Sequence, residues 1–403
     1  MTDVRPLPPP VLASPWATPS RLELQAEARR FARDEVLPVA DELDPRRADF
    51  PDGFLDRIAQ QGYFGIMVPT AGGGLGLGVF EYCLVAEELA RAWMSVASII
   101  ARGQGMGTAV PDPDRRAELL KRSAAGRWIG AAGFSEPGAG SDLAGVATRA
   151  TRTGDSWVID GRKRWTGFAL KADFIQVLAR TRDPGPGEPR AAGLVNLLVP
   201  KERGSFPPGI TGRPIDKIGY HGFTTWELDL DDVRVPAGNV LGEDGNGTES
   251  FRAVQHQLNV ARVHTAARAV GLARAAVEDC VAYLQQREQF GHPLADFQAL
   301  RFDLAEMAAA VEQARSFYQA VAHRIDLGER CEREAAMCKL TATEMAVRVT
   351  NQAMQLFGGN GYTTEHQVER HWRDARLTTI FEGTSQIQKR IIADRMLPRS
   401  PLS

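Results

Sequence analysis

The hydrophobic periodicity of this chain changes twice, and that double change constrains its fold more than any other feature. Up to about residue 130, apolar residues recur mainly at steps of three and four, as in α-helices. The next stretch has short apolar runs bounded by glycine, proline and aspartate, a pattern typical of β-strands. From about residue 250 the helical spacing returns. We therefore predict an α+β protein of several domains, with the β part in the middle.

The middle of the chain contains several segments with strand character. Residues 156–165 are expected to form a hairpin, because Asp160-Gly161 suits a primed two-residue turn. Residues 225–231 alternate between apolar and polar side chains, as in a half-buried strand. Two further strands are expected from short apolar runs at 172–180 and 194–199.

The C-terminal part has the most regular helical pattern, which predicts long helices packed as a four-helix bundle. Its longest apolar run consists of Leu300, Leu304, Met307, Val311, Ala314, Tyr318, Val321 and Ile325. The central β domain is expected to be β-barrel-like or a β-sandwich. The expected boundaries are 1–20 for a flexible proline-rich arm, 21–130 for an N-terminal α-helical domain, 131–245 for the β domain and 246–403 for the bundle.

Charge and composition argue against several classes of partner. The chain has 48 Lys and Arg against 50 Asp and Glu, a net charge of −2, which disfavours a nucleic-acid-binding surface. No apolar run is long enough to span a membrane, and residues 1–10 lack the apolar core of a signal peptide. The four cysteines form no C-x-x-C pair and the histidines lack metal-ligand spacing. We expect no bound metal and a cytoplasmic location.

The segment Ser-Glu-Pro-Gly-Ala-Gly-Ser-Asp, residues 135–142, is the first candidate for chemistry. Its small residues allow close approach of a ligand, and its N–H groups with Ser141 can hold phosphate oxygens. It is not a Rossmann fingerprint, because Leu143 stands in place of the third glycine. Taken alone, a tight turn between domains is the simpler explanation.

Three other segments are equally open when taken singly. Glu382 lies in Phe-Glu-Gly-Thr-Ser-Gln, where it is either a functional carboxylate or a solvated residue at a helix start capped by Thr384 or Ser385. The segment Arg-x-Gln-Phe-Gly, which begins at Arg287, suits a helix end followed by a loop. Trp165 suits an aromatic residue of a sheet.

Together, the segments resemble the acyl-CoA dehydrogenase family of flavoproteins. Their order and spacing agree with that family from about residue 21 to residue 397, as does the α–β–α organisation. The matching features are Glu-Pro-Gly-Ala-Gly-Ser-Asp, a tryptophan at position 165, Arg-x-Gln-Phe-Gly, Gln-x-x-Gly-Gly-Asn-Gly-Tyr and Phe-Glu-Gly-Thr-Ser-Gln-Ile-Gln.

The resemblance implies that FAD binds between the β domain and the bundle, with a neighbouring subunit completing the site. Trp165 is then expected to pack on the isoalloxazine ring, and Arg287 to reach the adenosine and pyrophosphate part across the subunit interface. The residues implied in cofactor binding are Phe134, Ser135, Gly140, Ser141, Trp165, Thr166, Gly167, Arg287, Gln289, Phe290, Phe297, Gln298, Gln355, Gly358, Gly359, Thr384 and Gln386.

The resemblance also implies a reaction, the α,β-dehydrogenation of an acyl thioester to the trans-2-enoyl thioester. A carboxylate removes the α-proton while the β-hydrogen leaves as hydride to the flavin. Glu382 holds the usual base position of the family, while Ala261 occupies the alternative one, and burial is expected to raise the pKa of the base toward neutrality. The residues implied in substrate binding are Ser141, Asn259, Arg262, Phe381 and Gly383.

The chain departs from the family pattern in ways that keep alternatives open. Gly167 stands where many members have a hydroxyl residue, which keeps an oxygen-using acyl-CoA oxidase open. Asn259 and Asp394 replace an acidic and a basic residue near the CoA region, which keeps a carrier-protein thioester open. The acyl tail of the family lies between helices of the two α domains. Trp93, Met94 and Phe381 are either walls of that pocket, which would favour a short, branched or compact acyl group, or ordinary core residues.

The implied partners are an acyl-CoA, an electron-transfer flavoprotein and further copies of the chain in a homotetramer, a dimer of dimers. A flavin monooxygenase on the same scaffold needs no base such as Glu382. A non-enzymatic acyl-CoA-binding protein needs neither that base nor the flavin motifs. The resemblance therefore favours an FAD-dependent acyl-CoA dehydrogenase over both.

Overall fold

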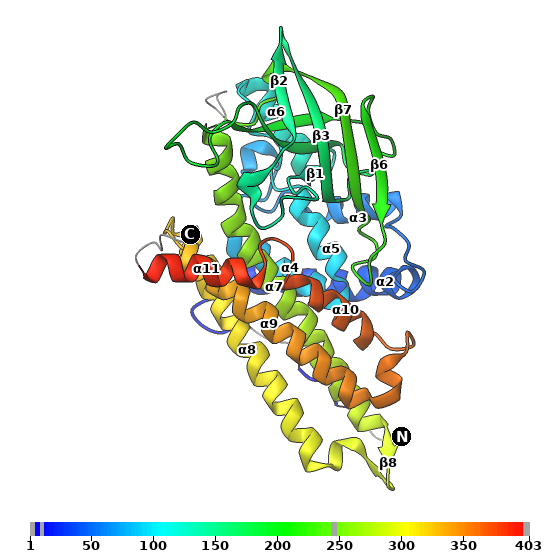
Figure 1. The fold of residues 1–403 in the computed structure, drawn as a ribbon. Coiled ribbons are helices and arrows are strands. Elements are labelled where there is room, and N and C mark those ends of the chain that lie inside the picture. Colours follow the sequence, from blue (N-terminus) through cyan, green and yellow to red (C-terminus); the bar gives the residue numbers. More distant parts are fainter. Residues whose placement is uncertain (1–4, 9–11, 243–247, 398–403) are drawn as a thin grey trace.

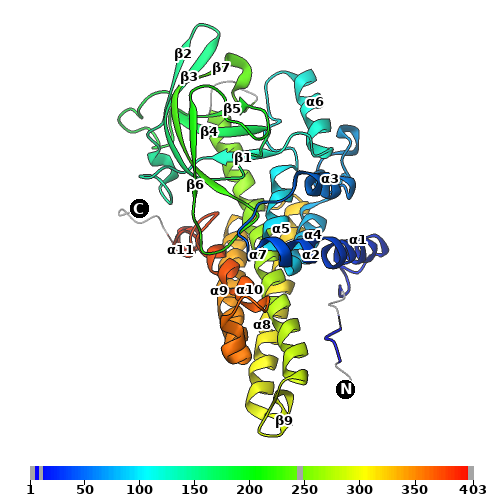
Figure 2. The same cartoon turned by 90° about the vertical axis from the view of Figure 1, so that its right-hand side faces the viewer.

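The computed structural model describes residues 5–8, 12–242 and 248–397. A curled sheet lies at one end, long helices extend to the other, and the short N-terminal helices pack beside the junction (Figures 1 and 2). The α+β prediction with helical N- and C-terminal parts is confirmed. Within the described ranges, no helix is long and apolar enough to cross a membrane.

In the described residues of the N-terminal part there are six α-helices. They are α1 (Pro19–Phe31), α2 (Leu37–Leu43), α3 (Asp52–Gln60), α4 (Val79–Ala92), α5 (Met94–Ile99) and α6 (Pro113–Ala124). The Thr18 side chain caps α1 by accepting a hydrogen bond from the Arg21 amide, and Asp112 caps α6 in the same way. A π-helical turn, Ala32–Val36, joins α1 to α2.

Two apolar side chains of the proline-rich arm predicted at residues 1–20 pack against the rest of the chain, whereas most of its other described residues are exposed. Leu12 is 5% exposed. The Trp16 ring lies 4.6 Å from His323 and 5.5 Å from Phe80, between ring centres. These two apolar side chains cover part of a helical surface, whereas the flexibility of the arm stays a prediction. Residues 1–4 and 9–11 lie outside the described ranges.

The central domain contains one seven-stranded sheet in the order β1-β4-β2-β3-β7-β6, with β5 paired to β4. The strands are β1 (Gly130–Gly133), β2 (Arg149–Thr153), β3 (Ser156–Gly167), β4 (Phe174–Arg180), β5 (Leu194–Pro200), β6 (Ile210–Ile215) and β7 (Thr225–Pro236). Pairing is antiparallel except between β1 and β4 and between β2 and β4. Every residue of β4 is buried, as expected for a strand read as a continuous apolar run.

The hairpin predicted at Asp160-Gly161 is wrong. The turn lies earlier, between Thr153 and Ser156, and β3 continues through Gly161 as one strand paired with β7. The register shifts between Ile159 and Gly161, so the Asp-Gly pair marks a bulge. A Cβ at position 161 would lie 2.5 Å from the Thr148 side-chain oxygen, which explains the glycine.

The C-terminal part consists of α7 (Thr248–Gln286), α8 (Gln298–Asp326), α9 (Glu332–Phe357), α10 (Val368–Thr378) and α11 (Ser385–Met396). A short hairpin of β8 (Glu288–Gln289) and β9 (His292–Pro293) links α7 to α8. Helix α7 packs against α4, α8, α9 and α10, whereas α11 crosses the end nearest the sheet (Figure 1). The expected domain boundary at 245/246 lies outside the described residues.

Buried ion pairs join α4 to α7. Glu88 accepts a hydrogen bond from Arg274 at 2.6 Å, and Glu87 accepts one from the same guanidinium at 2.9 Å. None of the three side chains is more than 4% exposed. Removing one partner would leave an uncompensated buried charge, so this contact fixes how the two helical domains meet.

Candidate active site

Glu382 lies on the turn between α10 and α11. Its backbone φ of 53° is in the left-handed region, which a residue with a side chain rarely adopts. Lys339 of α9 holds this turn, because its Nζ donates hydrogen bonds to the carbonyl oxygens of Phe381, at 2.8 Å, and Gly383. A neighbouring helix thus fixes the backbone on both sides of Glu382.

The carboxylate of Glu382 contacts α7. Its Oε2 accepts hydrogen bonds from Thr265 Oγ1 and, at 2.8 Å, from Arg268 Nη2. Arg268 is 1% exposed, and its Nη1 also donates to Ser98 Oγ of α5 at 2.7 Å. Its guanidinium carbon lies 4.8 Å from the ring centre of Phe381. Arg268 therefore connects helices of both α domains to the candidate base.

The pKa of Glu382 is lowered, which contradicts the expected rise toward neutrality. Burial raises this pKa, but Arg268, Thr265 and Arg102 stabilise the charged form and together outweigh burial. The carboxylate side chain keeps 25% of its surface exposed. The expectation was wrong because it considered desolvation without the cation that the fold places beside the carboxylate.

Aromatic side chains surround this ion pair. Tyr82 of α4 stacks on His264 with ring centres 4.3 Å apart, and Tyr220 lies edge-on to Phe381 at 6.0 Å. Burial lowers the pKa of His264 well below its ordinary value, so the imidazole is neutral. Aromatic side chains and a neutral imidazole therefore lie near the ion pair of Glu382 with Arg268.

Trp93 and Met94, considered as walls of an acyl pocket, lie in the core. They are 1% and 0% exposed, respectively. The Trp93 ring packs edge-on against Phe50 at 5.0 Å between ring centres. This packing gives both residues a structural role.

A buried ion pair holds the loop that follows β1. Glu136 accepts hydrogen bonds from Lys163 Nζ at 2.7 Å and from the amides of Ala147 and Thr148. Lys163 is fully buried and also donates to the carbonyl oxygen of Phe134 at 3.3 Å. Burial lowers the pKa of Lys163 to about 8. The pair fastens this loop to β3.

The end of β3 lies beside the same loop, since one of its backbone N–H groups donates a hydrogen bond to the carbonyl oxygen of Ser135. Trp165 has a φ of 67° and is 54% exposed. Thr166 is fully buried, and its hydroxyl has no hydrogen-bond partner among the described residues. A Cβ at Gly167 would lie 2.3 Å from the Phe223 ring, so packing requires a glycine there.

The remaining residues expected to bind the cofactor lie at the opposite end of the bundle, around β8 (Figure 1). Phe290 is 90% exposed there, and Tyr362 is 87% exposed after α9. One chain therefore does not bring the two groups together. The group at this end consists of Arg287, Gln289, Phe290, Phe297, Gln298, Gln355, Gly358 and Gly359.

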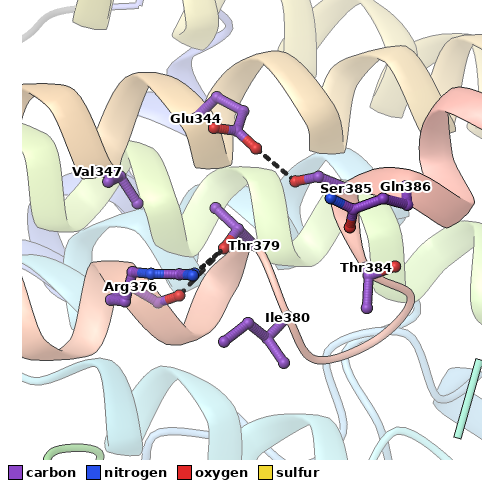
Figure 3. Close-up of a pocket in the computed structure, with 8 residues that line it drawn as sticks. All are labelled: Glu344, Val347, Arg376, Thr379, Ile380, Thr384, Ser385 and Gln386. Atoms are coloured by element: carbon purple, nitrogen blue, oxygen red, sulfur yellow. Dashed lines mark hydrogen bonds between the residues drawn. The ribbon is translucent and has the colours of Figure 1, made fainter.

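A pocket of about 340 Å³ lies between α9 and the turn that leads into α11 (Figure 3). Glu344 accepts a hydrogen bond from Ser385 at 2.5 Å, and Arg376 donates one to Thr379 at 2.6 Å. The lining residues are Glu344, Val347, Arg376, Thr379, Ile380, Thr384, Ser385 and Gln386. Two of the residues expected to bind the cofactor, Thr384 and Gln386, thus face a cavity next to the Glu382 turn.

The residues expected to bind substrate are divided among three elements, namely α7, the loop after β1 and the turn between α10 and α11. Arg262 of α7 donates a hydrogen bond to Asn259, and burial lowers its pKa. Ser141 is exposed on the loop after β1. Phe381 and Gly383 flank Glu382 directly.

Three residues of the site were missed by the sequence reasoning, namely Thr265, Arg268 and Lys339. Their helical spacing places them on faces that are otherwise apolar, such as the stretch His-Thr-Ala-Ala-Arg-Ala-Val. A cation on the apolar stripe of a helix was the available signal, because such a charge is rarely buried without a partner.

Models of three domains match successive parts of the chain. The acyl-CoA dehydrogenase N-terminal domain matches residues 18–127, the middle domain 131–233 and the C-terminal domain 249–397. The chain belongs to the acyl-CoA dehydrogenase family. Members of this family are FAD-dependent oxidoreductases, so this chain is an oxidoreductase that uses FAD.

Individual relatives of the family cover nearly the whole chain. A 3-(aryl)acrylate reductase of Clostridium sporogenes is 37% identical over 92% of this chain and 96% of its own. The structure of butyryl-CoA dehydrogenase from Megasphaera elsdenii has a TM-score of 0.86 at 32% identity, covering 94% and 98% of the two chains. A chain in the structure of the electron transferring flavoprotein of Acidaminococcus fermentans has a TM-score of 0.87 at 31% identity, covering 95% and 99%.

Proposed function

We propose that this chain oxidises a short or branched acyl-CoA to the trans-2-enoyl-CoA, with Glu382 as the base that removes the α-proton. The observation that carries the proposal is the position of this carboxylate, on a turn clamped by Lys339 and against α7 between the two helical domains. Ala261, at the alternative position, has no group that can accept a proton. The similarity to butyryl-CoA dehydrogenase supports a short acyl group.

The contacts of Glu382 suit a base. A carboxylate must be ionised to accept a proton, and Arg268 and Thr265 both stabilise the ionised form. The same hydrogen bonds fix where the carboxylate lies, which matters because catalysis depends on short, aligned distances between reacting atoms. Lys339 acts as a positioning residue, since it touches the backbone around Glu382.

FAD, when bound, supplies the acceptor for the hydride that leaves the β-carbon. The chain fits this cofactor, because the unpartnered Thr166 hydroxyl is buried where polar atoms normally have a partner and Trp165 beside it is exposed. We propose that one chain holds the flavin end with Phe134, Ser135, Gly140, Ser141, Trp165, Thr166, Gly167, Thr384 and Gln386.

We infer that a second chain completes the cofactor site and that the protein is a homotetramer built as a dimer of dimers. The residues around β8 are far from Trp165 within one chain, and Phe290 and Tyr362 there expose large aromatic surfaces. Exposed aromatic residues of this kind are typical of subunit interfaces. Phe290→Ala should lower both the mass measured by light scattering and the FAD content.

We propose an electron-transfer flavoprotein as the electron acceptor and the cytoplasm as the location. The similarity to a chain in an electron transferring flavoprotein structure supports the acceptor. The four cysteines are buried and free, as is usual in a reducing compartment. Gly167 has a packing reason in Phe223, so it does not require an oxidase.

The experiment is an anaerobic titration of the purified holoenzyme with acyl-CoA thioesters from butyryl to octanoyl, with isobutyryl and isovaleryl included. Bleaching of the oxidised flavin band by one of them would support the proposal. Glu382→Gln should keep FAD and lower kcat by about 10²–10⁴-fold. Glu118→Gln, an exposed change on α6, is the matched control. Unchanged turnover in Glu382→Gln would refute the base.

A further inference from the structure

Arg268 stabilises the ionised base, but this role leaves part of its hydrogen-bonding capacity unused. A guanidinium bonded to a base stabilises the ionised form and so opposes the uptake of a proton. Arg268 is also not required to hold the turn, since Lys339 fixes its backbone and Thr265 bonds its carboxylate. The Nη atoms of Arg268 have acceptors, but its Nε is buried and has no acceptor among the described residues, which leaves one donor for a further group.

The region around Glu382 has more positive than negative groups. Arg102 also acts on the Glu382 carboxylate, and it lies 5.3 Å from the ring centre of Phe223 without a salt bridge to any described residue. The Nε atoms of both Arg102 and Arg268 are buried and have no acceptor in the described part of the chain. His264 is neutral there. Of the two arginines, Arg268 bonds Glu382 directly, whereas Arg102 lowers the pKa of that carboxylate through its charge, so two guanidinium groups act on one described carboxylate.

Such an imbalance is costly where the donor atoms are buried, because a buried charge needs a counter-charge and each buried donor needs an acceptor. Arg268 bonds Ser98 of α5 and lies on α7, so the excess charge is located between helices of the two α domains. Tyr82 and Tyr220 add further aromatic bulk around it. The missing group is therefore small and anionic.

We propose that the acyl group of the substrate carries a carboxylate at the end remote from the thioester, and that Arg268 and Arg102 receive it. This inference rests on the proposed dehydrogenase function and narrows the substrate to a CoA monothioester of a short dicarboxylic acid. A carboxylate on Arg268 offsets the positive charge that acts on Glu382. The base then gains proton affinity when the correct substrate is bound, which couples recognition to chemistry.

The test compares thioesters that differ only in the terminal group, glutaryl-CoA against pentanoyl-CoA and succinyl-CoA against butyryl-CoA. With the FAD-loaded enzyme, kcat/KM should be about 10²-fold or more higher for at least one carboxylated member of a pair. Calorimetry should show a lower Kd for that carboxylated thioester than for its uncarboxylated partner. Arg268→Gln and Arg102→Gln should each reduce that preference, while Arg330→Gln, on an exposed loop, should keep it.

The outcomes separate this inference from the proposed function. Oxidation of pentanoyl-CoA and butyryl-CoA as efficiently as both carboxylated partners would leave the dehydrogenase intact and overturn the inference. If no thioester bleaches the flavin, the dehydrogenase proposal fails, and the calorimetric comparison still decides recognition. Equal Kd values within both thioester pairs would then overturn the inference of a carboxylated substrate. An unchanged preference for the carboxylated thioester in both arginine variants would overturn it as well.

Discussion

The Nζ of Lys339 lies 2.8 Å from the carbonyl oxygen of Phe381 and also bonds the carbonyl oxygen of Gly383. One buried ammonium group therefore holds the backbone on both sides of Glu382, whose φ of 53° is unfavourable for a residue with a side chain. Such a conformation persists only where its surroundings determine it. The position of the proposed base thus depends on a residue that does not touch the reacting atoms.

Replacing this ammonium group should lower turnover more than binding. In Lys339→Met the turn loses both hydrogen bonds, and a misplaced base reduces kcat by about 10–10²-fold, with a small change in KM. Steady-state kinetics on protein of measured FAD content checks this split. Lys121→Met, an exposed change on α6, is the control. A kcat equal to that of the unaltered protein would show that the turn holds itself.

The pH profile should report the pairing of Glu382 with Arg268. Burial raises the pKa of Glu382, but Arg268, Thr265 and Arg102 together lower it by more, so the base of the free enzyme stays ionised at a pH below the ordinary carboxyl pKa. Activity is lost only as pH falls through that lowered value. Arg268→Gln removes the largest of the effects that lower this pKa. The acid limb of the pH–activity profile of this variant should therefore move to higher pH. The limb is measured as kcat/KM for pentanoyl-CoA, since this profile reports the free enzyme. An unmoved limb would contradict control of the base by Arg268.

Much of the fold could be predicted because its elements carry local patterns. The strands β4, β5 and β7 come from runs and alternations visible in the sequence, and the long helices come from an unbroken spacing of three and four. The hairpin at Asp160-Gly161 failed for a physical reason. That dipeptide suits a bulge as well as a turn, and only the long pairing of β3 with β7 decides between them.

The site could be predicted only in part. The motif around Glu382 is contiguous, so the sequence singled it out. Arg268 and Lys339 lie on two different helices that reach the turn only in the folded chain. Helical spacing assigns both to an apolar face and cannot say what lies opposite. The sign of the Glu382 pKa shift depended on that long-range contact.

The reason for a glycine at position 167 can be tested, since either its packing against Phe223 or its effect on the flavin could require it. A Cβ at this position would lie 2.3 Å from the Phe223 ring, so Gly167→Ser should overpack the core and lower the free energy of unfolding by about 1–3 kcal/mol. Adding Phe223→Leu makes room and should restore part of the stability. Urea unfolding of the two variants measures this. Equal stability of Gly167→Ser and the unaltered protein would show that Phe223 yields without cost.

The ion pair of Lys163 with Glu136 should control how firmly the loop after β1, which we propose to contact FAD, is held. Both side chains are buried, at 0% and 7% exposed, and Glu136 also accepts two backbone amides of the segment that follows the loop. In Lys163→Met the carboxylate stays buried without its cation, which typically costs about 3–5 kcal/mol. FAD should then dissociate at lower temperature than from the unaltered protein. Arg190→Met is the matched control, because it breaks the ion pair with Asp142 near the same loop, whose side chains are 70% and 54% exposed. Such an exposed pair is worth about 0–1 kcal/mol. Thermal scans that follow flavin fluorescence and protein unfolding together give the temperature of FAD release and the temperature of unfolding for each variant. If the temperature of FAD release fell equally in Lys163→Met and Arg190→Met, burial of the Lys163–Glu136 pair would not matter to the loop.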